Sequence, residues 1–418
     1  MDLKVIELFA GVGGFRVGLN KIKEIDKETG KAVENGDWSF VWANQYEPSK
    51  KVQHAFECYT TRFGEENCSN VDINKVEKEL IPEHTLLVGG FPCQDYSVAR
   101  SLSNEKGIEG KKGVLFWDIR DILSLKQSPF VLLENVDRLL KSPANMRGRD
   151  FSVMLKTFDM LGYYVTWRVI NAGEYNMPQK RRRVFIFAFK KDTKYAEEFK
   201  KNNKEEILYT NLFNKIFPIK KENYKIAETD LNKYEDILEI SNKFSDGKFL
   251  ISGAMIDGKV YHADVVPVEE DIYSLRELLN NASQFEFNDK TNCIVDDGKL
   301  EKWKYLKGAK RIERVSKDGH KYIYSEGGMY FPENVDEPAR TMLTSEGTLN
   351  RSSHIIYDEE IEKYRILTPV ECEMIQMFPP NWTNTMPSKS RYFMMGNALV
   401  TGIIERLEPE LKRIIKAE

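Results

Sequence analysis

The first 190 residues alternate between continuous apolar runs and segments with helical period. Apolar runs without strict alternation are typical of strands buried on both faces of a sheet. They predict strands at 3–9, 39–44, 85–90, 130–136, 164–170 and 184–189. The segments between them predict helices near 14–22, 48–62, 115–126, 150–161 and 193–204. This order predicts an α/β fold, with a doubly wound, Rossmann-like mixed sheet covered by helices.

The pattern changes after about residue 190. Residues 191–364 are rich in Lys, Glu, Asn and Tyr, and their short strand-like runs lie between turn residues. Helical period returns at 368–378, and 396–415 predicts a closing helix. We therefore expect one domain from 1–190 plus 365–418, and a second, smaller and irregular domain from 191–364.

Composition narrows the class of protein. The chain has 418 residues, 41% of them hydrophobic, which is enough for a full core. It has neither an apolar run of membrane-spanning length nor the layout of a signal peptide, so we expect a cytoplasmic protein without membrane contact. The five cysteines form no CxxC pair, which argues against a disulfide framework and a zinc site, so we expect no metal.

Local charge is more informative than the net charge of −3. Basic residues outnumber acidic ones between 301 and 321, and residues 180–183 read KRRR. A protein that is slightly acidic overall can still present a basic cleft to phosphates.

A glycine-rich turn, ELFAGVGGFRVGL at 7–19, follows the first strand. Such a turn lets the backbone approach a ligand at the carboxyl edge of a sheet, although tight turns use glycine without any ligand. Because the pattern departs from GxGxxG, it favours an adenosyl ligand without phosphates. The end of the second strand, WANQYE at 42–47, offers a polar and an aromatic side chain for ribose and adenine, and Asp72-Ile73 would close the adenine pocket.

Two strand ends carry candidate reactive groups. Cys93, in GGFPCQDYS at 89–97, follows a proline at a strand exit and precedes a polar segment with Gly107, Gly110 and Gly113. A reactive thiol is placed there in an open α/β sheet, whereas most free cysteines are simply buried. Glu134 ends an apolar strand in LLENVDRLL at 132–140, where burial raises the proton affinity of a carboxyl group unless backbone amides or an arginine saturate it.

Arg181 and Arg183 precede the last strand of this region, in MPQKRRRVFIFA at 177–188. Residues two apart on an extended chain point to the same side, so both guanidinium groups could grip a carbonyl or a phosphate. A solvated strand edge is the alternative interpretation.

Taken together, these segments resemble the ordered motifs of the DNA (cytosine-5) methyltransferases of the bacterial restriction–modification type. The motifs are ELFAGVGGF, GGFPCQDYS, ENV, PQKRRRVF, RILTPVECEMIQMFP and GNALV, in this order. The resemblance covers about 1–190 and 365–418, and 191–364 corresponds to the variable target-recognition region. It implies that Cys93 is the nucleophile, that Glu134 engages cytosine N3, and that Arg181 and Arg183 hold the base carbonyl and the catalytic geometry.

The same resemblance implies S-adenosyl-L-methionine as cofactor. The residues expected to bind it are Phe9, Ala10, Gly11, Gly13, Gly14, Gln45, Tyr46, Asp72, Ile73, Pro92, Leu115, Asn397 and Ala398. One departure concerns Gln45-Tyr46, where many members of the family have an acid–Trp pair. Glutamine can still bond a ribose hydroxyl and tyrosine can still pack on adenine, so we expect cofactor binding to be kept but weakened.

The implied substrate is double-stranded DNA from which the cytosine is flipped. The segment 94–113, with Gln94 and Ser97, is expected to close on the DNA, and the basic stretch 301–321 to meet phosphates. Base reading is expected from 327–354, through Arg340, Thr344 and Arg351, although this glycine-rich segment could instead pack on the core. We expect a monomer that pairs functionally with a restriction endonuclease.

Three other functions remain open from the sequence. Cytosine-5 methylation of tRNA needs the same motifs, a nicotinamide-dependent oxidoreductase uses the same kind of sheet, and an inactive relative could bind DNA alone. The oxidoreductase gives Cys93 no role, and intact Cys93 and Glu134 count against the inactive relative.

Overall fold

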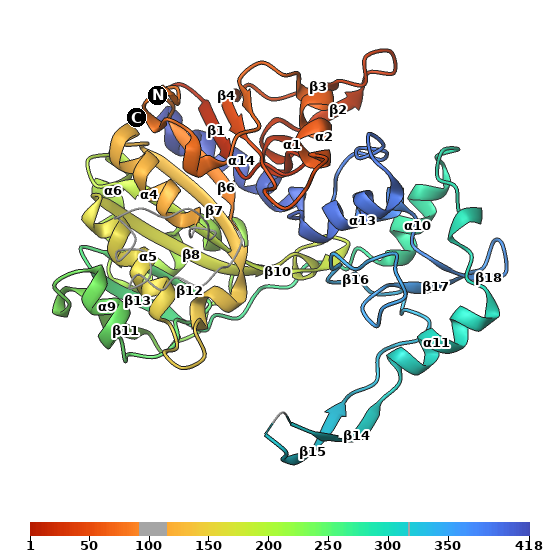
Figure 1. Ribbon diagram of the computed structural model, residues 1–418. Helices are drawn as coiled ribbons and strands as arrows, with labels where there is room; N and C mark the ends of the chain where they lie inside the picture. Colours follow the sequence, from red (N-terminus) through yellow and green to blue (C-terminus); the bar gives the residue numbers. More distant parts are fainter. Residues whose placement is uncertain (92–114, 317) are drawn as a thin grey trace.

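The computed structural model describes residues 1–91, 115–316 and 318–418, and is built around a ten-stranded mixed sheet (Figure 1). The strand order is β11-β13-β12-β8-β10-β7-β6-β1-β4-β5. The strands are β1 (Lys4–Leu8), β4 (Ser39–Asn44), β5 (Cys68–Ser69), β6 (Leu86–Gly90), β7 (Phe130–Val136), β8 (Tyr163–Asn171), β10 (Arg182–Lys190), β11 (Ala227–Asp230), β12 (Ser252–Ile256) and β13 (Lys259–Ala263). The predicted α/β fold is confirmed.

The sheet has a parallel and an antiparallel half. Strands β5, β4, β1, β6 and β7 run parallel to one another, whereas β10 is antiparallel to β7 and to β8. Because β1 lies between β4 and β6, the strand order reverses beside it, which is where open α/β sheets bind ligands. The carboxyl ends of the parallel strands therefore share one edge with the start of β10.

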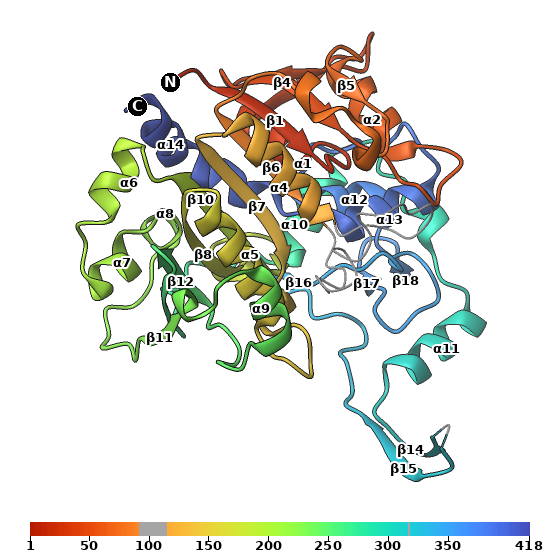
Figure 2. The ribbon, with the colours of Figure 1, turned by 60° about the vertical axis from the view of Figure 1, so that its left-hand side comes forward.

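Helices cover both faces of the sheet, as Figures 1 and 2 show. The helices on one face are α4 (Leu115–Lys126), α5 (Arg149–Met160) and α9 (Ile237–Lys243). Those on the other are α1 (Gly14–Asn20), α6 (Lys194–Phe199), α7 (Lys204–Thr210), α8 (Leu212–Ile216) and α14 (Thr401–Lys416). Two apolar clusters result, one under each layer, so the central strands are buried on both faces as their continuous apolar sequences predict.

The sheet continues beyond residue 190. Strand β12 pairs with the edge of β8, with Ser252 opposite Arg168, and β13 and β11 follow outward. Residues up to Ala263 thus extend the sheet, although the sequence pattern assigns 191–364 to the second domain. An added strand covers backbone donors and acceptors that β8 would otherwise expose at its edge.

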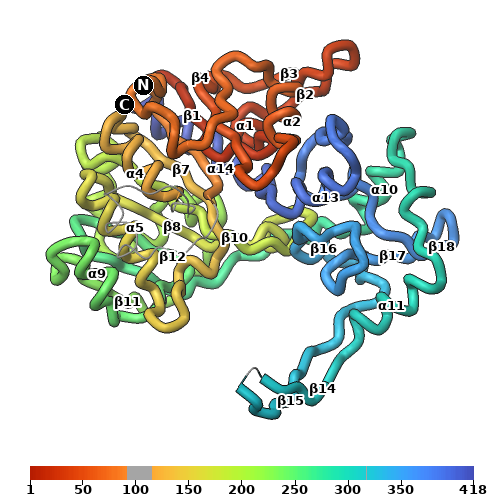
Figure 3. Tube along the Cα trace, viewed as in Figure 1, coloured from red at the N-terminus to blue at the C-terminus, as the bar shows by residue number. Residues whose placement is uncertain are grey.

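A smaller lobe follows Ala263 and lies beside the sheet (Figures 1 and 3). Its elements are α10 (Leu275–Ser283), α11 (Asp297–Lys307), β14 (Lys310–Val315), β15 (Lys321–Glu326), β16 (Ala339–Arg340), β17 (Ile355–Asp358) and β18 (Lys363–Ile366). The hairpin β14–β15 projects from this lobe. The lobe is tied back to the sheet domain by a short parallel pair between β16 and β9 (Gln179–Lys180).

The remaining elements line the junction between the two lobes or lie at the rim of the sheet domain. They are α2 (His54–Phe63), α12 (Pro369–Ile375), α13 (Ser388–Asn397) and the hairpin β2 (Ile22–Ile25)–β3 (Ala32–Glu34). The TPVE sequence starts α12 with a capping box, because Thr368 and Glu371 exchange side-chain and backbone hydrogen bonds and proline occupies the first turn. The two termini meet at α14, where the Met1 amino group donates to Ile415 O (3.1 Å; Figure 3).

One predicted helix begins later than expected. The closing helix was expected over 396–415, but α13 ends at Asn397 and α14 begins at Thr401. Ala398 has extended backbone (φ −65°, ψ 155°), and the Gln376 side chain donates to the carbonyls of Met395 and Ala398. The helical period of the sequence does not reveal this break, because it is stabilised by a side chain from α12's carboxyl end.

Candidate active site

The turn after β1 has the backbone conformation that its glycines allow. Gly11 and Gly13 have φ of 56° and 89°, and α1 begins at Gly14. A Cβ on Gly13 would lie 2.6 Å from the Phe63 ring, so both conformation and space require glycine there. Phe9 also has a positive φ (54°), a strain that is characteristic of functional sites.

Glu7 stabilises this turn through hydrogen bonds on its buried side. Its fully buried carboxyl group accepts hydrogen bonds from the Phe15 amide (3.2 Å) and the Tyr59 hydroxyl (3.0 Å). Burial raises the pKa of Glu7 to about 7, because the charged form loses its hydration. The carboxyl group therefore links β1, α1 and α2 below the turn.

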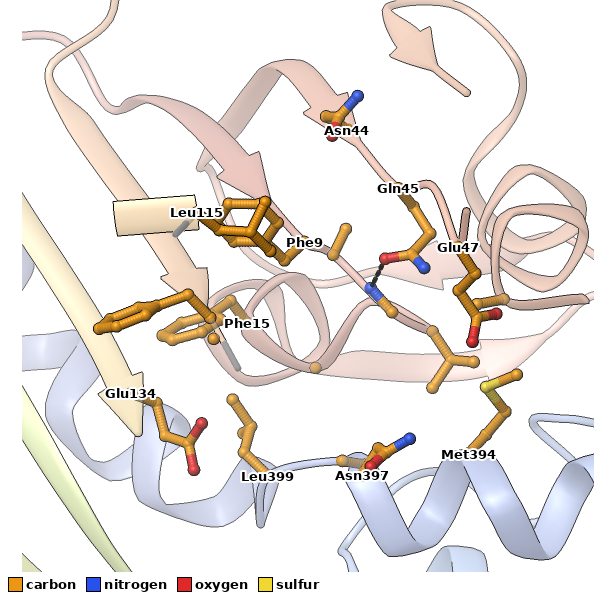
Figure 4. A pocket seen from close by; sticks show the side chains of 18 of the residues that line it. Phe9, Phe15, Asn44, Gln45, Glu47, Leu115, Glu134, Met394, Asn397 and Leu399 are labelled. Carbon is orange, nitrogen blue, oxygen red and sulfur yellow. Dashed lines mark hydrogen bonds between the residues drawn. The ribbon is translucent and has the colours of Figure 1, made fainter. Parts of the chain in front are cut away.

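A cavity of about 480 Å³ lies above this turn, at the carboxyl ends of the parallel strands (Figure 4). The predicted cofactor residues that line it are Phe9, Ala10, Gly11, Gly14, Gln45, Tyr46, Asp72, Ile73, Leu115, Asn397 and Ala398. Gly13 shapes the turn without lining the cavity. The structure thus brings together segments from both ends of the chain, as the resemblance requires.

Glu134 lies at the edge of the same cavity, on β7. Its Oε1 is 3.0 Å from Arg183 Nε, and a Cβ on Gly90 would lie 3.2 Å from its Oε2. Burial raises the pKa of Glu134, and the charges of Arg183 and Arg181 partly oppose that rise. The site therefore holds a carboxyl group that takes up a proton more readily than one in water.

Arg181 and Arg183 have different surroundings. The Arg183 guanidinium pairs with Glu134, whereas the buried Arg181 donates from Nη1 to Met342 O (2.9 Å) and from Nη2 to Gly396 O (3.0 Å). Burial and the neighbouring Arg183 lower the pKa of Arg181 to about 9. Arg181 thus connects the small lobe with the end of α13, while its buried Nε has no partner among the described residues.

Four predicted site residues, Pro92, Cys93, Gln94 and Ser97, lie outside the described residues, as does the rest of the expected closing segment. The described chain on either side of them reaches the cavity, since Gly90, Phe91 and Leu115 line it. The role of Cys93 therefore stays a prediction.

The chemistry of the lining fits an adenosyl group. Phe9, Ile73 and Leu115 offer apolar surface for a base, and the Gln45 side chain offers polar atoms for a sugar. Among the described lining residues the only guanidinium groups are those of Arg181 and Arg183, and both are engaged with protein oxygens. Among these described lining residues a pyrophosphate-bearing dinucleotide would find no free guanidinium group.

The predicted DNA-reading residues have distinct environments in the small lobe. Arg340 donates to both carboxylate oxygens of Glu333 (2.8 and 2.7 Å), and Lys307 donates to the same carboxylate. Arg351 donates to Leu306 O (2.8 Å), so both arginines hold other segments of the lobe. Thr344 is exposed in the loop after β16.

Several lining residues were not singled out by sequence reasoning. They include Asn44, Glu47, Gly90, Met394 and Leu399. Glu47 could have been found, because it ends the segment WANQYE at the exit of the second predicted strand. Asn44 lies in the same segment, Gly90 in GGFPCQDYS and Leu399 in GNALV, whereas the position of Met394 depends on long-range packing.

Two general features concern the described residues only. They contain no group of His, Cys, Asp or Glu side chains arranged to hold a metal ion. None of their helices has both the length and the apolar content to cross a bilayer.

Comparison with known proteins places the chain in a family. The family model for C-5 cytosine-specific DNA methylase matches residues 3–413. The chain is 47% identical to Type II methyltransferase M.Sau3AI of Staphylococcus aureus, over 99% of this chain and 96% of that protein. It is 33% identical to Type II methyltransferase M.HhaI of Haemophilus parahaemolyticus, over 46% of this chain and 50% of that protein.

Solved structures agree at the level of the fold. The DNMT2 structure of Spodoptera frugiperda, a triple mutant, superposes with a TM-score of 0.56 at 16% identity and covers 99% of both chains. The Dnmt2 methyltransferase of S. pombe gives 0.55 at 15% identity, again over 99% of each chain. With the family match spanning nearly the whole sequence, the chain belongs to the C-5 cytosine-specific DNA methylases.

Proposed function

We propose that this enzyme, which like its family transfers a methyl group from S-adenosylmethionine to carbon 5 of cytosine in DNA, does so with Cys93 as nucleophile and Glu134 as proton donor. The substrate is a cytosine flipped out of a duplex with a defined sequence. The cavity beside Glu134 receives the cofactor.

The observation that carries this proposal is the environment of Glu134. Its side chain is only 13% exposed at the edge of the cavity, its pKa is raised, and Arg183 fixes its orientation. Gly90, at the end of the strand that leads to Cys93, leaves room for it. A carboxyl group that keeps its proton can donate it to cytosine N3.

The residue types match the difficulty of the reaction. Carbon 5 of cytosine is a poor nucleophile until the Cys93 thiolate adds to carbon 6, while Glu134 protonates N3 and prevents negative charge from building up on the ring. Bound S-adenosylmethionine supplies the methyl group to carbon 5. A base then removes the carbon-5 proton, the thiolate leaves as the double bond between carbons 5 and 6 re-forms, and N3 returns its proton to Glu134. Cysteine suits both steps because it adds and leaves readily.

The arginines hold this arrangement. Arg183 orients Glu134 and lies close enough to the carboxyl group to reach the base carbonyl on the same side. Arg181 positions two backbone segments, one from each lobe, around the mouth of the cavity. Phe9, Gln45, Asp72, Ile73, Asn397 and their lining neighbours bind the cofactor.

Recognition of DNA is assigned to the small lobe. Since the sheet extends to Ala263, we place the start of the recognition domain after that residue and its end near 364. Thr344 is in the exposed loop that reads bases together with Gln94 and Ser97, while Arg340 and Arg351 set the shape of that loop before meeting DNA. The basic stretch 301–321 binds phosphates. The likeness to Type II methyltransferases supports pairing with a restriction endonuclease, and we propose that the enzyme acts as a monomer.

Trapping with 5-fluorocytosine tests the mechanism. Because fluorine at carbon 5 is not lost as a proton, duplex DNA carrying this base at the modified position should form a stable adduct with the enzyme and S-adenosylmethionine. The substrate site is first found by bisulfite sequencing of plasmid DNA after expression. Denaturing gel electrophoresis and peptide mass spectrometry should locate the adduct at Cys93.

The matched control is Cys93→Ser, which should form no adduct and lose turnover while keeping its affinity for S-adenosylhomocysteine. An adduct at another residue, or none on a methylated site, would overturn the mechanism. Labelled methyl incorporation into bulk tRNA, measured alongside plasmid DNA, tests the tRNA alternative, for which we expect no signal.

A further inference from the structure

The Gln45 side chain has a fixed orientation in the cavity. Its Oε1 accepts a hydrogen bond from the Gly11 amide (2.8 Å), within the glycine turn (Figure 4). A backbone N–H needs an acceptor, so the amide oxygen must face Gly11 and the Nε2 group must face elsewhere. Nε2 has no hydrogen-bond partner among the described residues. Gln45 therefore faces a ligand with its Nε2 donors, while its Oε1 is turned toward Gly11, which occupies one of the two lone pairs of that oxygen.

Glu47 supplies the acceptor that Gln45 does not. It lies two residues further along the same strand exit, is half-buried and lines the cavity. Figure 4 shows its carboxylate directed inward, between Gln45 and Met394. Burial raises its pKa, and Lys50 and His54 act on it only through their charges. Within the part of the chain described, the carboxylate forms no hydrogen bond or ion pair.

The fold does not need this carboxylate. The local turn is held by the Gln53 side chain, which accepts from the Glu47 amide (2.9 Å) and donates to the Glu47 carbonyl (3.0 Å). Gln53 also donates to Lys50 O (2.9 Å). A half-buried carboxylate without a protein partner is unfavourable by itself, and it becomes favourable when a ligand supplies hydrogen-bond donors.

The ribose of an adenosyl cofactor has two adjacent hydroxyl groups, and each must donate one hydrogen bond. Gln45 Nε2 can bond only to their oxygen atoms. We propose that the Glu47 carboxylate accepts hydrogen bonds from the ribose hydroxyls of S-adenosylmethionine, while Gln45 donates to a ribose oxygen. This inference rests on the proposed cofactor site. Gln45 and Glu47 then share the contacts with the ribose that a single carboxylate at position 45 would otherwise make.

A ligand-and-residue cycle tests this assignment. Isothermal titration calorimetry would compare S-adenosylhomocysteine with its 2′-deoxy and 3′-deoxy analogues on wild-type enzyme and Glu47→Ala. A hydrogen bond to a charged group is worth enough to weaken binding of the parent ligand roughly 10- to 100-fold in the variant. At least one deoxy analogue should bind wild-type enzyme more weakly than the parent, but bind Glu47→Ala about as well as the parent does.

Two further variants sharpen the test. Glu66→Ala removes an exposed carboxylate outside the cavity and should leave all affinities unchanged. Adding Gln45→Glu to Glu47→Ala restores an acceptor beside the ribose and should recover most of the lost affinity. The inference would be overturned if each deoxy analogue bound more weakly than the parent ligand by the same factor in wild-type enzyme and in Glu47→Ala. It would also be overturned if Glu47→Ala bound the parent ligand as tightly as wild-type enzyme. Cys93 trapping at saturating cofactor would still succeed then, so failure here is distinct from failure of the proposed mechanism.

Discussion

Arg183 Nε lies 3.0 Å from Glu134 Oε1, across the antiparallel pair of β10 and β7. Arg183 is opposite Val136, so Glu134 is its diagonal neighbour on the same face of the sheet, within reach of a long side chain. The ion pair is therefore set by strand register. It places a cation beside a carboxyl group whose burial favours the protonated form.

This geometry predicts how pH affects the enzyme. Because Arg183 lowers the pKa of Glu134 against the effect of burial, Arg183→Ala should raise that pKa further. If protonated Glu134 is the active form, the high-pH limb of the kcat/KM profile moves to higher pH in Arg183→Ala, although the rate itself falls. Initial rates of tritiated methyl transfer across pH would measure this.

The control for the pH profile is Glu134→Gln, which keeps the side chain's shape without a titrating proton. Its turnover should fall about 10²- to 10⁴-fold, and the limb assigned to Glu134 should vanish. A limb that persists in Glu134→Gln, or one that moves to lower pH in Arg183→Ala, would contradict the assignment.

Gly90→Ala should reduce turnover with little change in stability. The added Cβ would lie 3.2 Å from Glu134 Oε2, which forces the carboxyl group to shift by a few tenths of an ångström. Gly298→Ala is the matched control, because it lies outside the segments expected to bind DNA and its Cβ would meet only Asp296 Oδ1, at an ordinary contact distance of 3.4 Å. We expect roughly a tenfold loss of kcat in the first variant, since small displacements of catalytic groups are costly, and none in the second. Equal kcat values would show that Glu134 has freedom to move.

Glu7 should make stability fall as pH rises. Its pKa is raised from 4.5 to about 7, so the folded state holds the proton more tightly than the unfolded chain. The resulting stabilisation is complete below pH 4.5 and is lost as pH rises through 7, by up to about 3 kcal/mol. In Glu7→Gln, thermal unfolding between pH 5 and 8 should lack this slope. A parallel decline in both proteins would mean that another group titrates.

Glu333, in the small lobe, should have the opposite effect to Glu7, because it makes stability fall as pH decreases. Mainly through its hydrogen bonds to Arg340, its pKa is lowered to about 2 despite burial. Its contribution to stability is present above pH 4.5 and is lost as pH falls through about 2. Arg340→Ala should therefore lower the melting temperature at neutral pH and weaken DNA binding for all sequences alike. A selective change at one base pair, without loss of stability, would instead make Arg340 a direct reader of bases.

The central strands were predictable because burial on both faces demands continuous apolar sequence. The predicted 130–136 matches β7, and 184–189 lies within β10. The addition of β12 to β8 was not predictable, since short strands carry no local mark of their partner. The same holds for the break at Ala398, which depends on Gln376.

For the site, the ordered motifs predicted residues that line the cavity. They did not predict the hydrogen bonds and ion pairs that the predicted side chains form. The presence of Gln45 and Ile73 in the wall follows from strand ends that share one edge. Arg340 forms hydrogen bonds with Glu333, and Arg181 connects two distant segments. These contacts depend on the folded structure, so the spacing of residues along the sequence does not predict them. The assignments of Cys93, Gln94 and Ser97 stay predictions.

The parallel pair of β9 and β16 bears on how specificity can be transplanted between related enzymes. Ala339 and Arg340 pair with Gln179 and Lys180, and Arg181 is bonded to Met342 O just beyond. If a transplanted recognition segment ends before Ala339, the chimaera keeps the pairing of β9 with β16. One that crosses it must bring a backbone matched to Gln179 and Arg181, or the grafted loop will be misaligned over the host's reaction centre.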